Sequence, residues 1–174
     1  MALIDRVLVV GTGFMGNALA NALHDNKVAA SIIGVEPNSE YREQAIRNDC
    51  YQQIVPGISQ VELPPTLAVI CSPIEYVVPL CCELLGRFDQ AVITDIASIK
   101  CEIVDKMKSL APDGLSRYVP AHPITGSDRT GPIRPPQSIF TDRSCVITPM
   151  AENHKEDVAQ VDALWTSIGS QVFY

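Results

Sequence analysis

The feature that most constrains this chain is a short apolar run that breaks into three glycines. Residues 7–10 (Val-Leu-Val-Val) are apolar and mostly β-branched, and Gly11, Gly13 and Gly16 follow in the spacing G-x-G-x-x-G. A helical pattern of apolar residues begins directly after them. Strand, tight turn and helix in this order are typical of the first unit of a doubly wound α/β fold, in which the turn binds a dinucleotide.

Each glycine has its own physical reason. Gly11 lets the chain turn sharply off the strand, Gly13 lets a pyrophosphate approach the backbone, and Gly16 lets the helix pack close to the strand. The helix then presents its free N–H groups and its positive dipole end to the phosphates. We therefore expect the following residues of this turn to bind the cofactor: Gly11, Gly13, Phe14, Met15 and Gly16.

An acidic residue stands at the expected distance from the glycine turn. A second apolar run, residues 31–35, ends at Glu36, about twenty residues beyond the turn. A carboxylate there accepts hydrogen bonds from both ribose hydroxyls of an adenosine and repels a 2′-phosphate. The pattern favours NAD as the cofactor. Arg42, which can contact a 2′-phosphate, leaves NADP open, and a solvated strand end is the alternative explanation of Glu36.

The composition fits one α/β domain in an aqueous compartment. The chain has 174 residues, of which 47% are hydrophobic, enough for a sizeable core. A formal net charge of −7 argues against a nucleic-acid partner. The sequence shows no signal-peptide pattern and no apolar run long enough to span a bilayer, so we expect a cytoplasmic protein without a membrane partner.

The cysteines show no metal-ligand spacing, and no base near them suggests a catalytic thiol. We expect no bound metal. The simplest interpretation is that all six are small buried hydrophobic residues: Cys50, Cys71, Cys81, Cys82, Cys101 and Cys145.

Strand-like and helix-like segments alternate along the whole chain. Buried-strand patterns recur at residues 66–71, 91–95 and 144–148, with helical patterns between them. This alternation predicts a doubly wound, mostly parallel Rossmann-type sheet with helices on both faces, formed by residues 1–174 as one dinucleotide-binding domain. Ligands of such sheets lie beyond the carboxyl ends of the strands, so we expect Ser72 and Pro73 to lie at the cofactor as well.

His122 is the leading candidate for a catalytic group on this rim. It follows a short strand predicted at residues 117–120 and precedes a proline. A neutral imidazole can accept the proton of a substrate hydroxyl while hydride leaves the same carbon. The alternative is a histidine that only hydrogen-bonds its own loop.

Four further polar residues lie in the turns of the same rim. Ser98 either hydrogen-bonds the substrate or the nicotinamide carboxamide, or caps the next helix, and Lys100 can be a first-turn helix residue without a ligand. Asp128 can orient His122 or bind substrate, and Arg129 can pair with a substrate carboxylate. A solvated loop pair is the alternative for Asp128 and Arg129.

Two of these turns resemble those of a known enzyme family. Residues 94–100 (Thr-Asp-Ile-Ala-Ser-Ile-Lys) resemble the D-x-x-S-x-K turn of the prephenate and arogenate dehydrogenases. Residues 121–128 (Ala-His-Pro-Ile-Thr-Gly-Ser-Asp) resemble the family's H-P-x-x-G-(S/T)-(E/D) segment. The glycine turn, the acid and the Ser72-Pro73 step match in order and spacing, so the resemblance covers nearly the whole chain.

The resemblance implies an oxidoreductase of tyrosine biosynthesis. The family oxidises prephenate or arogenate with NAD(P) and releases carbon dioxide, which gives 4-hydroxyphenylpyruvate or tyrosine. By this resemblance, His122 takes the proton of the ring hydroxyl as hydride passes to the nicotinamide, and Ser98 helps to place both groups. Aromatisation supplies the driving force, so the protein need only orient the ring and accept one proton.

The family pattern also has parts that this sequence lacks. Its members carry a helical second domain, which dimerises the protein and supplies basic residues for the substrate carboxylates. That domain is absent from this chain, so we expect an incomplete site here, and a homodimer where the domain is present. Asp128 stands where glutamate is more usual, and residues 132–136 are unusually rich in proline.

Two other functions remain compatible with the sequence. One is another hydroxyacid-type dehydrogenase of related fold, although such enzymes usually carry a catalytic lysine in the second domain and the His122 turn fits them poorly. The other is a stand-alone nucleotide-binding or regulatory module without catalysis.

Overall fold

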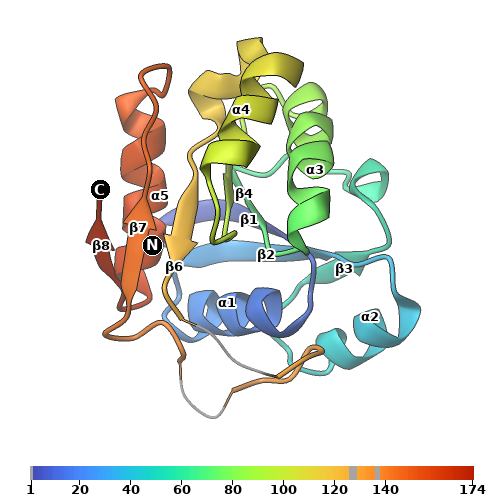
Figure 1. Cartoon of the computed structure of the whole chain (residues 1–174). Helices are drawn as coiled ribbons and strands as arrows, with labels where there is room; N and C mark the ends of the chain where they lie inside the picture. Colours follow the sequence, from blue (N-terminus) through green and yellow to red (C-terminus); the bar gives the residue numbers. More distant parts are fainter. Residues whose placement is uncertain (1, 126–128, 136–137) are drawn as a thin grey trace.

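The protein, described here by a computed structural model of residues 2–125, 129–135 and 138–174, is organised around a parallel sheet. Five strands lie in the order β3-β2-β1-β4-β5, and each pair is parallel (Figure 1). This sheet and its flanking helices confirm the predicted doubly wound architecture. The strands are β1 (Ile4–Val10), β2 (Ala29–Val35), β3 (Gln53–Val55), β4 (Leu67–Ile70) and β5 (Val92–Asp95).

Helices cover both faces of the sheet. Side chains of β1 alternate between the faces: Val7 and Val9 belong to the core shared with α1 and α5, whereas Leu8 and Val10 belong to the core shared with α3 and α4. Because both faces are covered, the buried parts of the central strands β1, β2 and β4 are apolar. The helices are α1 (Phe14–Asp25), α2 (Ser39–Ile46), α3 (Ile74–Arg87), α4 (Cys101–Leu110) and α5 (Lys155–Ser167), with short 3₁₀ turns at Ile58–Gln60 and Pro112–Arg117.

Among the residues that the structure describes, none of the helices is long and apolar enough to cross a membrane.

A second, three-stranded sheet continues from β5. It contains β6 (Ala121–Pro123), β7 (Ser144–Ile147) and β8 (Gln171–Phe173), with β6 antiparallel and β8 parallel to β7. A single bridge between Ile93 and Tyr118 joins it to the main sheet. The strand predicted at residues 117–120 is therefore misplaced, because β7 pairs with residues 121–123. His122 lies within a strand and not after one.

The interpretation of the cysteines holds only in part. Cys50 and Cys145 are buried, and burial raises the pKa of each thiol to about 12. Cys81 is also buried. Cys101, however, is exposed, because it opens the solvent-facing first turn of α4, and the remaining two thiols are half-buried. All six are free thiols.

The turn between β1 and α1 depends on two glycines. Gly11 has φ +93°, a conformation that L side chains rarely adopt. A Cβ atom placed on Gly16 would lie 1.9 Å from the carbonyl oxygen of Gly11. The start of α1 is thus pressed against the turn itself, as the spacing of the motif predicts.

We predict that Gly16→Ala lowers the free energy of unfolding by about 1–3 kcal/mol, because the added methyl group must displace the backbone of Gly11. Urea denaturation measures this change. Gly86→Ala is the matched control: Gly86 lies in α3, a Cβ there meets no atom within 4 Å, and the substitution should raise stability by about 0.5–1 kcal/mol. Equal stability of the Gly16→Ala variant and the wild type would contradict the close contact.

Candidate active site

A cavity of about 1020 Å³ opens at the carboxyl ends of β1, β2, β4 and β5. Its size is at the upper end of the range for small-molecule and cofactor sites. The cavity brings together most of the residues predicted from the sequence, from five separate turns. The predicted residues that line it are Gly11, Gly13, Phe14, Met15, Glu36, Ser72, Pro73, Ser98 and Arg129.

The start of α1 forms one end of this cavity. Gly13 is the N-cap residue and has no side chain to cap the helix, so the first-turn N–H groups face the cavity without a side-chain acceptor. A Cβ on Gly13 would meet no atom within 4 Å, which leaves open space at the backbone. Gly16 does not line the cavity but packs behind it, against Gly11. This arrangement suits an anionic group such as a diphosphate.

Glu36 is fixed by three donors. Its Oε2 accepts hydrogen bonds from the backbone N–H of Thr12 (3.0 Å) and from the Thr12 hydroxyl (3.3 Å), and its Oε1 accepts from the backbone N–H of Asn38 (3.0 Å). The side chain is only 7% exposed, so a solvated strand end is wrong as an explanation. Thr12, which is fully buried, holds the acid in place, and sequence reasoning missed this contact. The sequence feature that could have indicated this contact is the position of Thr12 between Gly11 and Gly13, in the turn next to the acid.

Arg42 lies behind the acid and is held by backbone groups. Its Nη1 donates to the carbonyl oxygens of Glu36 (2.8 Å) and Pro37 (2.7 Å). Both bonds fix the loop that carries Glu36. Arg42 does not line the cavity.

The turns after β4 and β5 complete the far end of the cavity. The Ser72 hydroxyl donates to the Val10 carbonyl (3.1 Å) and thereby joins two neighbouring turns. Ser98 is exposed on the cavity wall. It does not cap α4, because Lys100 occupies the N-cap position, so the capping alternative for Ser98 is wrong.

A buried polar network lies directly behind the Ser98 turn. Asp95 is fully buried, and its Oδ1 accepts from Lys100 Nζ (2.5 Å) and from the Ala97 backbone (2.8 Å). Its Oδ2 accepts from the Tyr118 hydroxyl (2.7 Å). Lys100 is therefore one half of a buried ion pair and not a simple first-turn residue. Burial lowers the pKa of Lys100, and Asp95 opposes that shift.

His122 lies on β6, beside β5, and is half-buried. Burial lowers the pKa of the imidazole, the Lys100 ammonium lowers it further, and the Asp95 carboxylate raises it. The neutral form, which can accept a proton, is favoured as a result. His122 does not itself line the cavity that holds Ser98.

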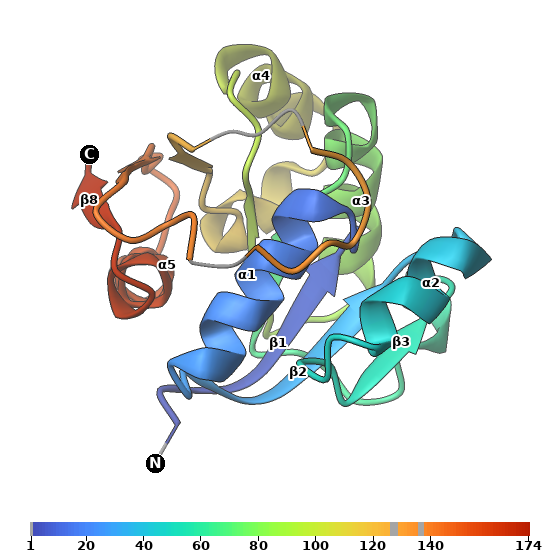
Figure 2. The same ribbon diagram turned by 90° about the horizontal axis from the view of Figure 1, so that it is seen from below.

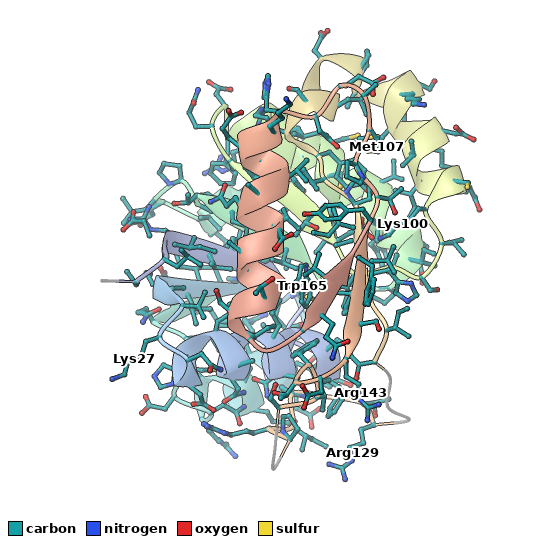
Figure 3. The ribbon with its side chains drawn as sticks, turned by 90° about the vertical axis from the view of Figure 1, so that its left-hand side faces the viewer. Lys27, Lys100, Met107, Arg129, Arg143 and Trp165 are labelled. Atoms are coloured by element: carbon teal, nitrogen blue, oxygen red, sulfur yellow. The ribbon has the colours of Figure 1, made fainter. Side chains whose placement is uncertain are left out.

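Of the two candidates that follow His122, the structure describes Arg129. Arg129 lines the cavity next to Thr130 and Gly131, and Figure 3 places it on the α1 side of the molecule, away from Lys100. Asp128 lies outside the described residues. Within the described ranges, no group of three or more His, Cys, Asp or Glu side chains is placed to hold a metal ion.

We predict that Asp95→Asn lowers the free energy of unfolding by about 3–5 kcal/mol, because it leaves the Lys100 charge buried without its partner. Denaturant titration measures the loss. Adding Lys100→Met to this variant removes the stranded charge and should recover part of the stability. Additive losses in the double variant would contradict a coupled pair.

Comparisons with known proteins agree with this fold. A family model described as "Prephenate dehydrogenase, nucleotide-binding domain" matches residues 19–174. The prephenate dehydrogenase of Bacillus subtilis is 27% identical over 168 residues, which are 92% of this chain and 43% of that protein.

Solved structures share the fold at lower identity. Prephenate dehydrogenase from Aquifex aeolicus, solved with hydroxyphenyl propionate and NAD+, has a TM-score of 0.89 at 24% identity over 98% of this chain and 59% of that one. Arogenate dehydrogenase from Synechocystis has a TM-score of 0.85 at 23% identity over 97% of this chain and 58% of that one. The chain thus spans about half the length of these relatives.

Proposed function

Because the chain belongs to the family of prephenate dehydrogenase nucleotide-binding domains, we propose that it is the cofactor-binding and proton-accepting part of an enzyme that oxidises prephenate or arogenate. One observation carries the proposal. The glycine turn, Glu36 and Ser98 line a single cavity. His122, on β6, has a lowered pKa. A small-molecule hydroxyl at the Ser98 end would meet a hydrogen-bonding group, and His122, which lies on β6 outside this cavity, is its proposed base.

NAD is the proposed cofactor, in preference to NADP. The Glu36 carboxylate is fixed at the cavity wall by Thr12 and Asn38, at the place where the adenosine ribose is expected. A 2′-phosphate there would face a buried negative charge. Arg42 is already bonded to two backbone carbonyls and does not line the cavity, so it offers that phosphate little compensation.

The proposed chemistry needs few groups from this chain. NAD, when bound, supplies the acceptor for the hydride. His122 accepts the proton of the ring hydroxyl as hydride leaves the carbon that bears it, and Ser98 holds the hydroxyl and the nicotinamide in register. Loss of carbon dioxide then makes the ring aromatic. Asp128 and Arg129 stay predictions as substrate-binding residues, and a homodimer stays a prediction for a protein that also carries the helical domain.

The proposal is tested by incubating the protein with NAD, and in parallel with NADP, in the presence of prephenate or arogenate. We expect reduction of the nicotinamide, followed by its absorbance, with release of carbon dioxide and faster turnover with NAD. Binding of NAD without reduction by either substrate would favour the non-catalytic nucleotide-binding module. Reduction with simple hydroxyacids alone would favour the related dehydrogenase class.

We predict that His122→Asn lowers kcat by about 100- to 10,000-fold and leaves the Kd for NAD unchanged, because the imidazole accepts a proton but lies outside the cofactor cavity. Steady-state assays measure kcat, and calorimetry measures the Kd for NAD. In a plot of wild-type kcat against pH, the acid limb should lie below pH 6.5, the usual pKa of an imidazole. Burial and the Lys100 ammonium both disfavour the protonated ring and so lower this pKa. Activity rises with pH through this limb. Full turnover of the variant would overturn the role of His122.

A further inference from the structure

Residues 129–135, called the strap here, include most of the proline-rich stretch that departs from the family pattern. The strap crosses the outer surface of α1 (Figure 2), and its first three residues reach the cofactor cavity. Arg129, Thr130 and Gly131 line the same cavity wall as Asn38 and Tyr41. The strap is therefore a part of the cavity that the strand–turn–helix motif does not supply.

Contacts with both α1 and α2 hold the strap in place. Arg134 Nη2 donates to both carboxylate oxygens of Asp25, at 2.9 and 2.7 Å, at the end of α1. The Pro132 carbonyl accepts from Asn48 Nδ2 at 3.2 Å, just beyond α2. A Cβ on Gly131 would lie 3.9 Å from the Tyr41 ring. These contacts, together with the fixed φ angles of proline, restrict the positions that the strap can take.

Arg129 is the position at which the described cavity wall can attract an anionic ligand. Among the described residues that line the cavity, Glu36 and Glu83 are negative and Arg129 alone is positive. The whole chain has a formal net charge of −7, which repels a dinucleotide. Arg129 is also two residues from Gly131, so their Cα atoms lie within about 7.6 Å of each other. That distance keeps Arg129 close to the part of the wall that Gly131 and Tyr41 form.

We propose that the strap is a fixed outer wall of the cofactor site, with Arg129 as a ligand of the cofactor's diphosphate. A guanidinium forms charge-assisted hydrogen bonds with phosphate oxygens, opposite the N–H groups at the start of α1. The diphosphate would thus be held from two sides, by α1 and by the strap. The inference rests on the proposed cofactor site and adds a residue to it.

The first test uses ADP-ribose, which keeps the diphosphate and lacks the nicotinamide. Arg129→Ala should raise the Kd for ADP-ribose by about 10- to 100-fold, the usual effect of losing a hydrogen bond to a charged group. The Kd for adenosine, which has no phosphate, should stay unchanged. Arg143→Ala is the matched control, because it removes the same charge from an exposed residue that does not line the cavity. We expect it to change the Kd for ADP-ribose less than twofold.

The outcomes separate this inference from the function on which it rests. Failure of the wild type to bind ADP-ribose would count against the cofactor site itself. Normal ADP-ribose binding by Arg129→Ala, or equal losses in Arg129→Ala and Arg143→Ala, would overturn the inference. A raised KM for prephenate with an unchanged Kd for ADP-ribose would return Arg129 to the substrate, as the sequence suggests.

The second test concerns the contacts that hold the strap. Asp25→Asn and Arg134→Gln should each raise the Kd for ADP-ribose by about 1.4- to 5-fold, the range for an exposed ion pair. The double variant Asp25→Arg with Arg134→Asp should restore the affinity. Glu102→Gln, which breaks an exposed ion pair on α4, is the control and should leave the Kd unchanged. An unchanged Kd in both single variants would show that the strap is not held by this pair.

Discussion

The carboxylate of Glu36 joins the two turns on which the cofactor site depends. It accepts the backbone N–H of Thr12, in the glycine turn, and that of Asn38, at the start of α2. The turn after β1 and the turn after β2 therefore hold each other in place. These bonds add to the backbone hydrogen bond from Gly11 to Val35 (2.8 Å), which holds the turn where Gly11 has φ +93°. One buried acid thus orients the helix N–H groups and stands where the adenosine ribose is expected.

Charge is distributed unevenly around this acid. The chain as a whole is negative, and the described wall of the cavity carries two glutamates. A dinucleotide diphosphate needs local compensation, and the start of α1 gives only the partial charge of its dipole. The remaining positive charge on the described wall comes from Arg129, more than a hundred residues along the chain from the glycine turn. The strap holds it there by binding to Asp25, at the end of α1, and to Asn48, just beyond α2.

The sequence predicts those parts of the molecule that depend on short-range patterns. The glycine turn, Glu36 and the order of strands and helices follow from local periodicity and spacing. Other features depend on which distant segments become neighbours. Tyr118 bonds Asp95 across 23 residues, and His122 lies in a strand because β7 pairs with it. The exposure of Cys101 and the ion pair of Lys100 likewise depend on how the start of α4 sits against β5, which no local pattern encodes.

The buried Asp95–Lys100 pair is better explained by its electrostatic effect on His122 than by a contribution to stability. Burying two charges costs several kcal/mol per ion, and the attraction between them rarely exceeds that cost. Here the pair lies beside His122 and acts on it with both charges, of which Lys100 has the larger effect. The hydrogen bonds from Ala97 and Tyr118 to Asp95 tie down the carboxylate that would favour the imidazolium. Burial and the positive charge of Lys100 are then the main effects on the pKa of His122. Both lower this pKa and so keep the imidazole neutral and able to accept a proton.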